Sequence, residues 1–347
     1  MNRQFTSCAD IQKPRTDEAR LWDILFGHAA YRALLVAYDL KFFPLLGKKP
    51  HRLAEISEAL NIHCRPAKAI LDVLVSIELV QVKDGYYSLT LLAEDYLVES
   101  SPTYFGGMLD IMLINTHTVA SVDSLKKAVL TNSPQLYHSE KPFNTHEEQV
   151  ELARTFTYAM HGHSIAPALV WPELIDLSKY KLLLDIGGGS GAHAIGAALK
   201  WSQLQATVLD MLPVCEIAKE FAQRYGLQSR IKTHTSDMWK DPFPAADIHF
   251  YADIYHDWLP EQGSFLTQKS FDSLPSGGRI IIHEMLYNES KTGPFTVAAY
   301  NMGMLVTMEG QQYSGSELSE MLAEAGFADI EVKRTLGYWS IVTGCKP

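Results

Sequence analysis

Residues with chemical potential stand at the ends of successive apolar runs in the second half of this 347-residue chain. The first run ends in Asp185 and enters IGGGSGAHAIGAALK, where Gly187 and Gly189 let the backbone turn tightly beside a ligand. The second run ends at Asp210, before Met211, and such a carboxylate can accept both hydroxyl groups of a ribose. These residues predict a nucleoside site.

The third run ends in Asp237 and Met238, with an indole next to them at Trp239. A carboxylate can bind the amino edge of adenine, while a thioether and an indole cover its faces. Ligands of open α/β sheets bind at the carboxyl ends of the strands. The three strand ends together therefore predict an adenosyl ligand.

A candidate general base, His256, follows the fourth run in the segment YADIYHDW. Imidazole titrates closer to neutral pH than any other side chain, which suits it to proton transfer. Glu284 ends the fifth run and is expected to accept a hydrogen bond from the imidazole and to raise its basicity. We predict these two residues to be catalytic.

The elements that must position these residues are short β-rich runs that alternate with helical segments after Pro172. This alternation predicts an α/β fold with a doubly wound, mainly parallel, seven-stranded sheet. The last two runs are joined by a short link, so we expect them to pair antiparallel. The expected helices span 192–200, 213–225 and 316–325.

Four regions are expected along the chain: a flexible arm (1–16), a winged-helix-like dimerisation domain (17–102), a helical linker that roofs the substrate pocket (103–170), and the catalytic domain (171–347). Residues 17–46 are apolar on nearly every side of a helix, which predicts burial against a second subunit. Two helices (53–60 and 65–77) and an Asp84-Gly85 hairpin follow, and they give the winged-helix outline.

The net charge of −10 argues against nucleic-acid and anionic-membrane partners. Cys8, Cys64, Cys215 and Cys345 show no paired spacing, so neither a disulfide framework nor a cysteine metal site is expected. The N-terminus lacks the apolar region of a signal peptide, and no run is long enough for a membrane span. A soluble cytoplasmic protein is the expectation.

Five motifs occur in a fixed order: LLLDIGGGSG, TVLDMLPV, SDMW, YHDW and GGRIIIHEML. With them, nearly the whole chain resembles the small-molecule O-methyltransferases of the plant caffeate and animal acetylserotonin type, together with bacterial natural-product relatives. The resemblance implies S-adenosylmethionine as the cofactor, bound through Gly187, Asp210, Asp237 and Met238. It also implies the class I methyltransferase fold and a homodimer.

In that family the histidine that matches His256 deprotonates the acceptor, and Glu284 matches its first supporting glutamate. Two departures stand out in this chain. Ala252 replaces a Lys or Arg that many members place four residues before the histidine. Gln312 stands where the second supporting glutamate would stand, and its neutral amide cannot stabilise an imidazolium as an anion does. Glu309 is a candidate to supply the lost charge.

The acceptor, a small and flat aromatic molecule with a hydroxyl group, is expected between the helix around Met160 and the segment 300–308. Methionines form adaptable apolar walls. We therefore expect the acceptor to contact Met160, His163, Met304 and Gln312.

Four alternatives remain open from the sequence. A metal-assisted C-methylation of an α-keto acid is suggested by several possible ligands, His161, His163, His256, Asp257 and His283. Their spacing is poor for metal ligands, and we predict no metal site. N-methylation would use the same base. The glycine turn and Asp210 also fit an NAD-dependent oxidoreductase. Against this reading, we find no second mononucleotide-binding unit after the first one. The winged-helix outline also raises a DNA-binding regulator, against which its few basic residues count.

Overall fold

The structure is a computed structural model that describes residues 13–115, 121–135 and 147–347. Most of the expected N-terminal arm and two parts of the expected roof, together with Cys8, lie outside these residues. The chain divides into two compact units, Met1–Ser101 and Pro102–Pro347. Within the described residues, no helix combines the length and apolarity needed to cross a membrane.

The first unit contains a small antiparallel sheet with helices around it. Its strands lie in the order β1-β3-β2, and the β2–β3 turn places Asp84 and Gly85 at φ 52° and 79°, as an Asp-Gly hairpin requires. Together with α3 and α4 this is the expected winged-helix outline. The elements are α1 (Ala19–Asp39), α2 (Phe42–Leu46), β1 (His51–Arg52), α3 (Leu53–Ala59), α4 (Cys64–Ser76), β2 (Val80–Lys83), β3 (Tyr86–Leu89) and α5 (Leu91–Leu97).

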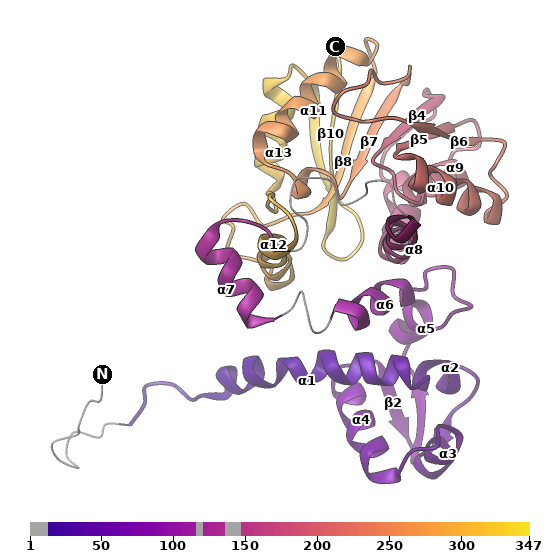
Figure 1. The fold of residues 1–347 in the computed structure, drawn as a ribbon, viewed down its shortest axis with the longest axis vertical. Helices are drawn as coiled ribbons and strands as arrows, with labels where there is room; N and C mark the ends of the chain where they lie inside the picture. The colour runs from indigo at the N-terminus through magenta and orange to yellow at the C-terminus, as the bar shows by residue number, and fades with distance from the viewer. Residues whose placement is uncertain (1–12, 116–120, 136–146) are drawn as a thin grey trace. The chain divides into compact units, whose positions relative to one another are not determined.

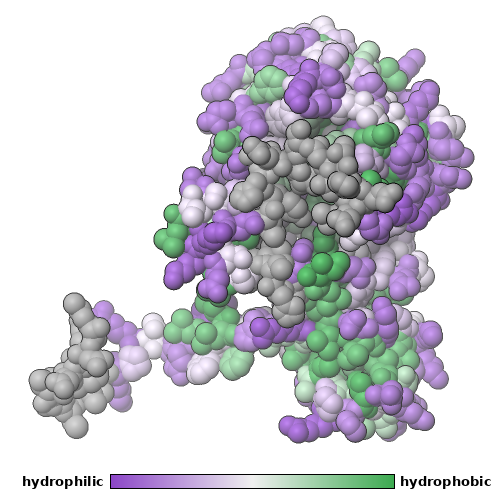
Figure 2. Space-filling view, in the orientation of Figure 1, coloured by the Kyte–Doolittle hydropathy of each residue, from purple (hydrophilic) through white to green (hydrophobic). Residues whose placement is uncertain are grey.

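Helix α1 is buried only over its last turns, where Leu35, Ala37 and Tyr38 lie in the core. Its first half extends beyond α4 and β2 (Figure 1). There the apolar side chains at positions 21, 22, 24, 25 and 26 are all more than half exposed, and Figure 2 shows apolar residues along this helix. The described residues of the chain therefore leave the first half of α1 uncovered, and its expected burial against a second subunit stays a prediction.

The second unit is built around a seven-stranded sheet with the order β6-β5-β4-β7-β8-β10-β9. Strand β10 pairs antiparallel with both β8 and β9, and the other pairs are parallel. The strands are β4 (Leu182–Ile186), β5 (Gln205–Asp210), β6 (Ile231–Thr235), β7 (Ile248–Ala252), β8 (Arg279–Met285), β9 (Ala328–Arg334) and β10 (Trp339–Cys345). The predicted doubly wound, mainly parallel fold is confirmed.

Alternation along the strands supplies a core on each face of the sheet. Leu183 packs with residues of α9 and α10, whereas its neighbour Leu184 packs with residues of α11 and α13. Figure 1 shows these two pairs of helices on opposite sides of the sheet. The helices of the unit are α6 (Gly106–Asn115), α7 (Val122–Thr131), α8 (Glu147–Val170), α9 (Ala192–Lys200), α10 (Leu212–Arg224), α11 (Pro260–Ser273), α12 (Phe295–Thr307) and α13 (Gly315–Glu324).

Candidate active site

The glycine turn links β4 to α9 and adopts a backbone that other residues avoid. Gly187 and Gly189 have φ values of 66° and 56°. A Cβ on Gly187 would lie 2.5 Å from Cδ1 of Ile254, so a larger residue would have to displace the end of that side chain in addition to straining the backbone. The N–H of Gly189 donates to Oδ2 of Asp210 at 2.9 Å. The first two predicted strand ends therefore meet at one edge of the sheet.

Asp185 and Asp210 have different surroundings in this turn. Asp185 is buried beneath the glycines and accepts a hydrogen bond from the N–H of Ala194 at 3.2 Å. Burial raises the pKa of Asp185 to about 7 and that of Asp210 to about 6. Asp210 is half-buried and also accepts from the N–H of Met211 at 2.8 Å, so it faces the edge where a ribose would bind. Asp185 instead supports the turn from below.

Asp237 and Met238 follow the next strand, β6. Asp237 is half-buried, accepts from the N–H of Trp239 at 2.9 Å, and lies 2.9 Å from the ammonium of Lys240, which lowers its pKa. Met238 packs against the same core as Trp239 and Trp258, whose rings are 5.0 Å apart. A carboxylate beside apolar and aromatic surfaces is thus present at the third strand end.

His256 lies in a short turn after β7 and is buried beside Glu284 of β8. Its Nδ1 is 2.6 Å from Oε2 of Glu284, and Oε1 of Glu284 accepts from the N–H of Tyr255 at 3.0 Å. Burial alone would lower the pKa of His256, but the charge of Glu284 opposes burial most strongly, and the pKa ends well above 6.5. This geometry matches a base with its supporting acid.

Two further groups contact the His256 ring. Asp257 places Oδ1 at 3.3 Å from Nε2, and the Tyr300 ring of α12 packs edge-on with centroids 5.3 Å apart. A third group, Asp253, was not predicted from the sequence, and its Oδ1 lies 3.7 Å from Nδ1. Its position three residues before His256 was the signal that could have found it.

The predicted acceptor residues lie on different elements. His163 on α8 points its Nε2 to Oδ2 of Asp253 at 3.5 Å. Met160 on the same helix is half-buried, and Met304 on α12 is 3% exposed. Gln312 is buried, and its side-chain amide has no hydrogen-bond partner among the described residues, so it does not orient His256. Glu309 is exposed, and the carboxylates whose charges raise the pKa of His256 are those of Glu284 and Asp257.

The histidines of the metal hypothesis do not form one close set of ligand nitrogens among the described residues. His161 bonds Ser190 at 2.9 Å and stacks on Phe221, whereas His283 stacks on Trp339 inside the core. Among the described residues, the three side chains whose possible ligand atoms lie within 4.8 Å of one another are instead Asp253, His256 and Glu284, a set with one histidine of that hypothesis.

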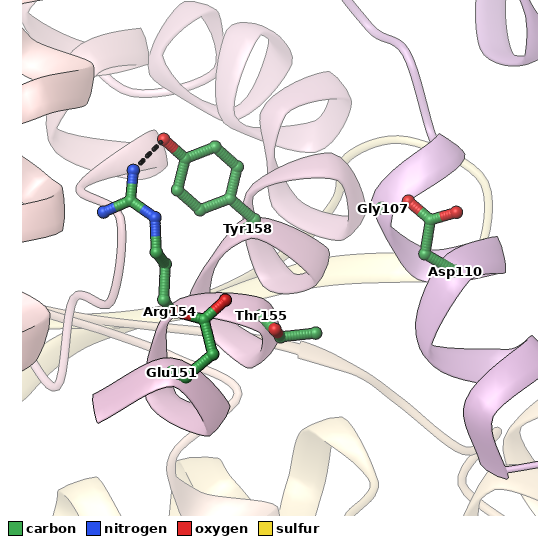
Figure 3. A pocket seen from close by; sticks show the side chains of 6 residues that line it. All are labelled: Gly107, Asp110, Glu151, Arg154, Thr155 and Tyr158. Atoms are coloured by element: carbon green, nitrogen blue, oxygen red, sulfur yellow. Dashed lines mark hydrogen bonds between the residues drawn. The ribbon is translucent and has the colours of Figure 1, made fainter. Parts of the chain in front are cut away.

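A separate cavity of about 320 Å³ lies between α6 and α8 (Figure 3). Its lining includes Arg154, which donates to the hydroxyl of Tyr158 at 3.1 Å. None of its lining residues is among those predicted for the cofactor or the base. The lining residues are Gly107, Asp110, Glu151, Arg154, Thr155 and Tyr158.

These features fit an adenosyl cofactor and define the class of protein. The glycine turn leaves open space at Gly189, where a Cβ would meet no atom within 4 Å, and the carboxylates of Asp210 and Asp237 stand at neighbouring strand ends. A buried histidine–glutamate pair stands at the next two strands of the same edge. The fold is that of a class I methyltransferase.

Comparisons with known proteins place the chain more narrowly. Residues 123–328 match the O-methyltransferase domain, and residues 22–99 match the O-methyltransferase dimerisation domain. The 3-hydroxy-5-methyl-1-naphthoate 3-O-methyltransferase of Streptomyces sahachiroi is 30% identical, with 94% of each chain covered. Acetylserotonin O-methyltransferase of Homo sapiens is 28% identical over 90% of this chain and 93% of that protein. The crystal structure of human N-acetylserotonin methyltransferase with S-adenosylmethionine has a TM-score of 0.81 at 27% identity, covering 96% and 99% of the two chains.

The chain therefore belongs to the O-methyltransferase family, and it is an S-adenosylmethionine-dependent O-methyltransferase that acts on small metabolites. The NAD-dependent oxidoreductase and the DNA-binding regulator raised from the sequence are wrong as descriptions of its activity. The glycine turn alone could not separate the first of these alternatives, because dinucleotide folds use the same turn.

Proposed function

We propose that the protein methylates a hydroxyl group of a small aromatic metabolite, with His256 as the general base. The observation that carries this proposal is the contact of 2.6 Å between Nδ1 of His256 and Oε2 of Glu284. With Nδ1 engaged by the acid, Nε2 is the nitrogen left to accept a proton.

In this mechanism the hydroxyl proton of the acceptor moves to Nε2 of His256, and the electron pair stays on the acceptor oxygen. S-adenosylmethionine, when bound, supplies an electrophilic methyl group on its sulfonium. Glu284 stabilises the imidazolium that forms, and an acceptor hydroxyl would replace Asp257 as the neighbour of Nε2. Gly187, Gly189, Asp210, Met211, Asp237 and Met238 would hold the cofactor, with Asp185 supporting the turn.

Apolar residues of two helices support an aromatic acceptor. Tyr300 packs against the His256 ring from α12, and Met304 lies one turn further along that helix. Met160 lies on α8, the helix that also brings His163 to the site. Together with the naphthoate acceptor named for the relative from Streptomyces sahachiroi, these residues favour a flat phenolic ring. We propose Met160 and Met304 as acceptor walls, with Gln312 and His163 behind them.

The test is methyl transfer from labelled S-adenosylmethionine to hydroxynaphthoates and simple phenols, with matched anilines and α-keto acids in parallel. Methyl ethers are expected from the phenols. Replacement of His256 by Ala should reduce kcat by about 10²- to 10⁴-fold, as loss of a general base does. Calorimetric binding of S-adenosylhomocysteine should stay intact. Methylation of only the amines or keto acids would contradict an oxygen acceptor.

We also propose a homodimer that covers the exposed half of α1. Leu25 and Phe26 are 59% and 61% exposed, and the surrounding region matches a dimerisation domain. Replacement of both residues by Asp should produce a monomer in sedimentation at micromolar concentration, because buried unpaired carboxylates oppose association. Asp at Leu91, an exposed leucine of α5 in the same unit, is the matched control. A monomeric wild-type protein would contradict the proposal.

A further inference from the structure

Asp253 is a buried acid beside His256 that the mechanism above does not use. It follows β7 directly, is 8% exposed, and has a backbone φ of 56°. Residues other than glycine seldom adopt this left-handed conformation, and Asp and Asn tolerate it best. Strained backbone of this kind concentrates at functional sites. The conformation places an acidic side chain between two histidines.

The two carboxylate oxygens of Asp253 face different imidazoles. Oδ2 lies 3.5 Å from Nε2 of His163, and Oδ1 lies 3.7 Å from Nδ1 of His256. Oδ1 has no hydrogen-bond partner among the described residues. Nδ1 of His256 therefore faces two carboxylates, that of Glu284 at 2.6 Å and that of Asp253.

The remaining titratable groups around this pair come from several elements. His193 of α9 and His283 of β8 both interact with Asp253, and burial lowers the pKa of each, so they stay neutral. Tyr300 of α12 also stays neutral, because burial raises its pKa. Asp257 and Tyr313 face the same site from the turn and from the segment before α13.

The carboxylate of Asp253 thus lies between the two imidazoles that it faces. Burial alone would raise the pKa of Asp253, but the contacts with His163 and His256 bring it below its usual value. Gln312, with a neutral amide, contributes no charge to this site. Asp253 consequently holds the second negative charge next to Nδ1.

We propose that Asp253 is a positioning residue whose carboxylate, oriented by His163, holds His256 and shares with Glu284 the stabilisation of the imidazolium. The proposal rests on the proposed function, in which His256 takes the proton of the acceptor. It also gives His163 a role through Asp253 in addition to any contact with the acceptor.

The test replaces Asp253 by Asn, which removes the charge and keeps a residue that tolerates the left-handed backbone. Asp329→Asn is the matched control, because Asp329 is exposed on β9 and has a φ of 50°. The first readout is the NMR titration of the His256 ring in protein labelled at histidine, assigned with His256→Gln. It requires no acceptor substrate.

Asp253→Asn should lower the titration midpoint of His256 by about one to three pH units, the effect of losing a nearby opposite charge, and Asp329→Asn should leave it unchanged. The acid limb of the kcat profile should move with the midpoint. An unchanged midpoint in a folded Asp253→Asn protein would overturn the proposal. A midpoint that falls without any change in the rate profile would instead overturn His256 as the base and leave the role of Asp253 intact.

A second pair of variants tests His163 and keeps the proposal falsifiable if Asp253→Asn does not fold. His163→Gln retains an N–H close to the position of Nε2, whereas His163→Phe retains the ring and its edge contact with Trp339. We expect His163→Phe to lower kcat with KM unchanged, and His163→Gln to retain more of kcat. Equal losses in the two variants, or a loss confined to KM, would show that His163 does not act through Asp253.

Discussion

His256 carries more negative charge around its ring than a free imidazole meets in water. Glu284, Asp253 and Asp257 all place an oxygen within 4 Å of a ring nitrogen. Each carboxylate favours the protonated ring, so the raised pKa has a direct physical cause. A base of this kind is strong, but it must lose its own proton before it can accept one.

The pH dependence of the reaction follows from this environment. Because only the neutral ring accepts a proton, kcat/KM should rise with pH through an apparent pKa above the usual 6.5 of histidine. The same raised pKa stabilises the fold fully below 6.5, and this contribution should be lost as pH rises through the folded-state value. Rate profiles and thermal unfolding across this range check both trends. A rate that is flat through the range would contradict the raised pKa.

Helix α8 is the element that connects the glycine turn with the surroundings of His256. His161 bonds Ser190 in the glycine turn at 2.9 Å, and His163 two residues later contacts Asp253. Arg154 pairs with Glu220 of α10 through both of its terminal nitrogens, at 2.9 and 2.8 Å. Helix α8 thus contacts the loops that follow β4 and β7, so its packing against α9 should matter for stability.

Gly196 permits the close packing of α8 against α9. A Cβ on Gly196 would lie 2.0 Å from the backbone oxygen of Ala168, so α8 and α9 would have to separate. Gly196→Ala should destabilise the protein by about 1–3 kcal/mol, as overpacking does. Gly303→Ala is the matched control, since Gly303 lies inside α12 with open space at its Cβ, and it should stabilise by about 0.5–1 kcal/mol. Denaturant unfolding of both variants checks the contrast, and equal effects would contradict it.

Across the whole molecule, the sheet and the strand-end residues were predictable from the sequence. Gly187, Asp210, His256 and Glu284 each stand at the end of an apolar run, and parallel strands bring such ends to one edge. The pairing of His256 with Glu284 follows because β7 and β8 are neighbours. The pattern of apolar residues restricts the register of adjacent strands, because a slip of one residue would turn every side chain to the other face of the sheet.

The contact between His163 and Asp253 was not predictable in the same way. It depends on how α8 packs across the unit and on the left-handed backbone at Asp253, and neither leaves a periodic signal. The apolar pattern of α1 predicted a helix that is covered by a second subunit. Among the described residues the first half of this helix is exposed, so its cover by a partner stays a prediction.

The most direct test of His256 as the base compares wild type with His256→Ala on phenols of graded acidity. A phenol that is neutral at the assay pH needs the base, whereas one that is already ionised does not. The loss of kcat in the variant should be about 10²- to 10⁴-fold for the neutral phenols and should shrink toward none as the acceptor ionises. An equal loss for neutral and ionised acceptors would show that His256 does not remove the proton.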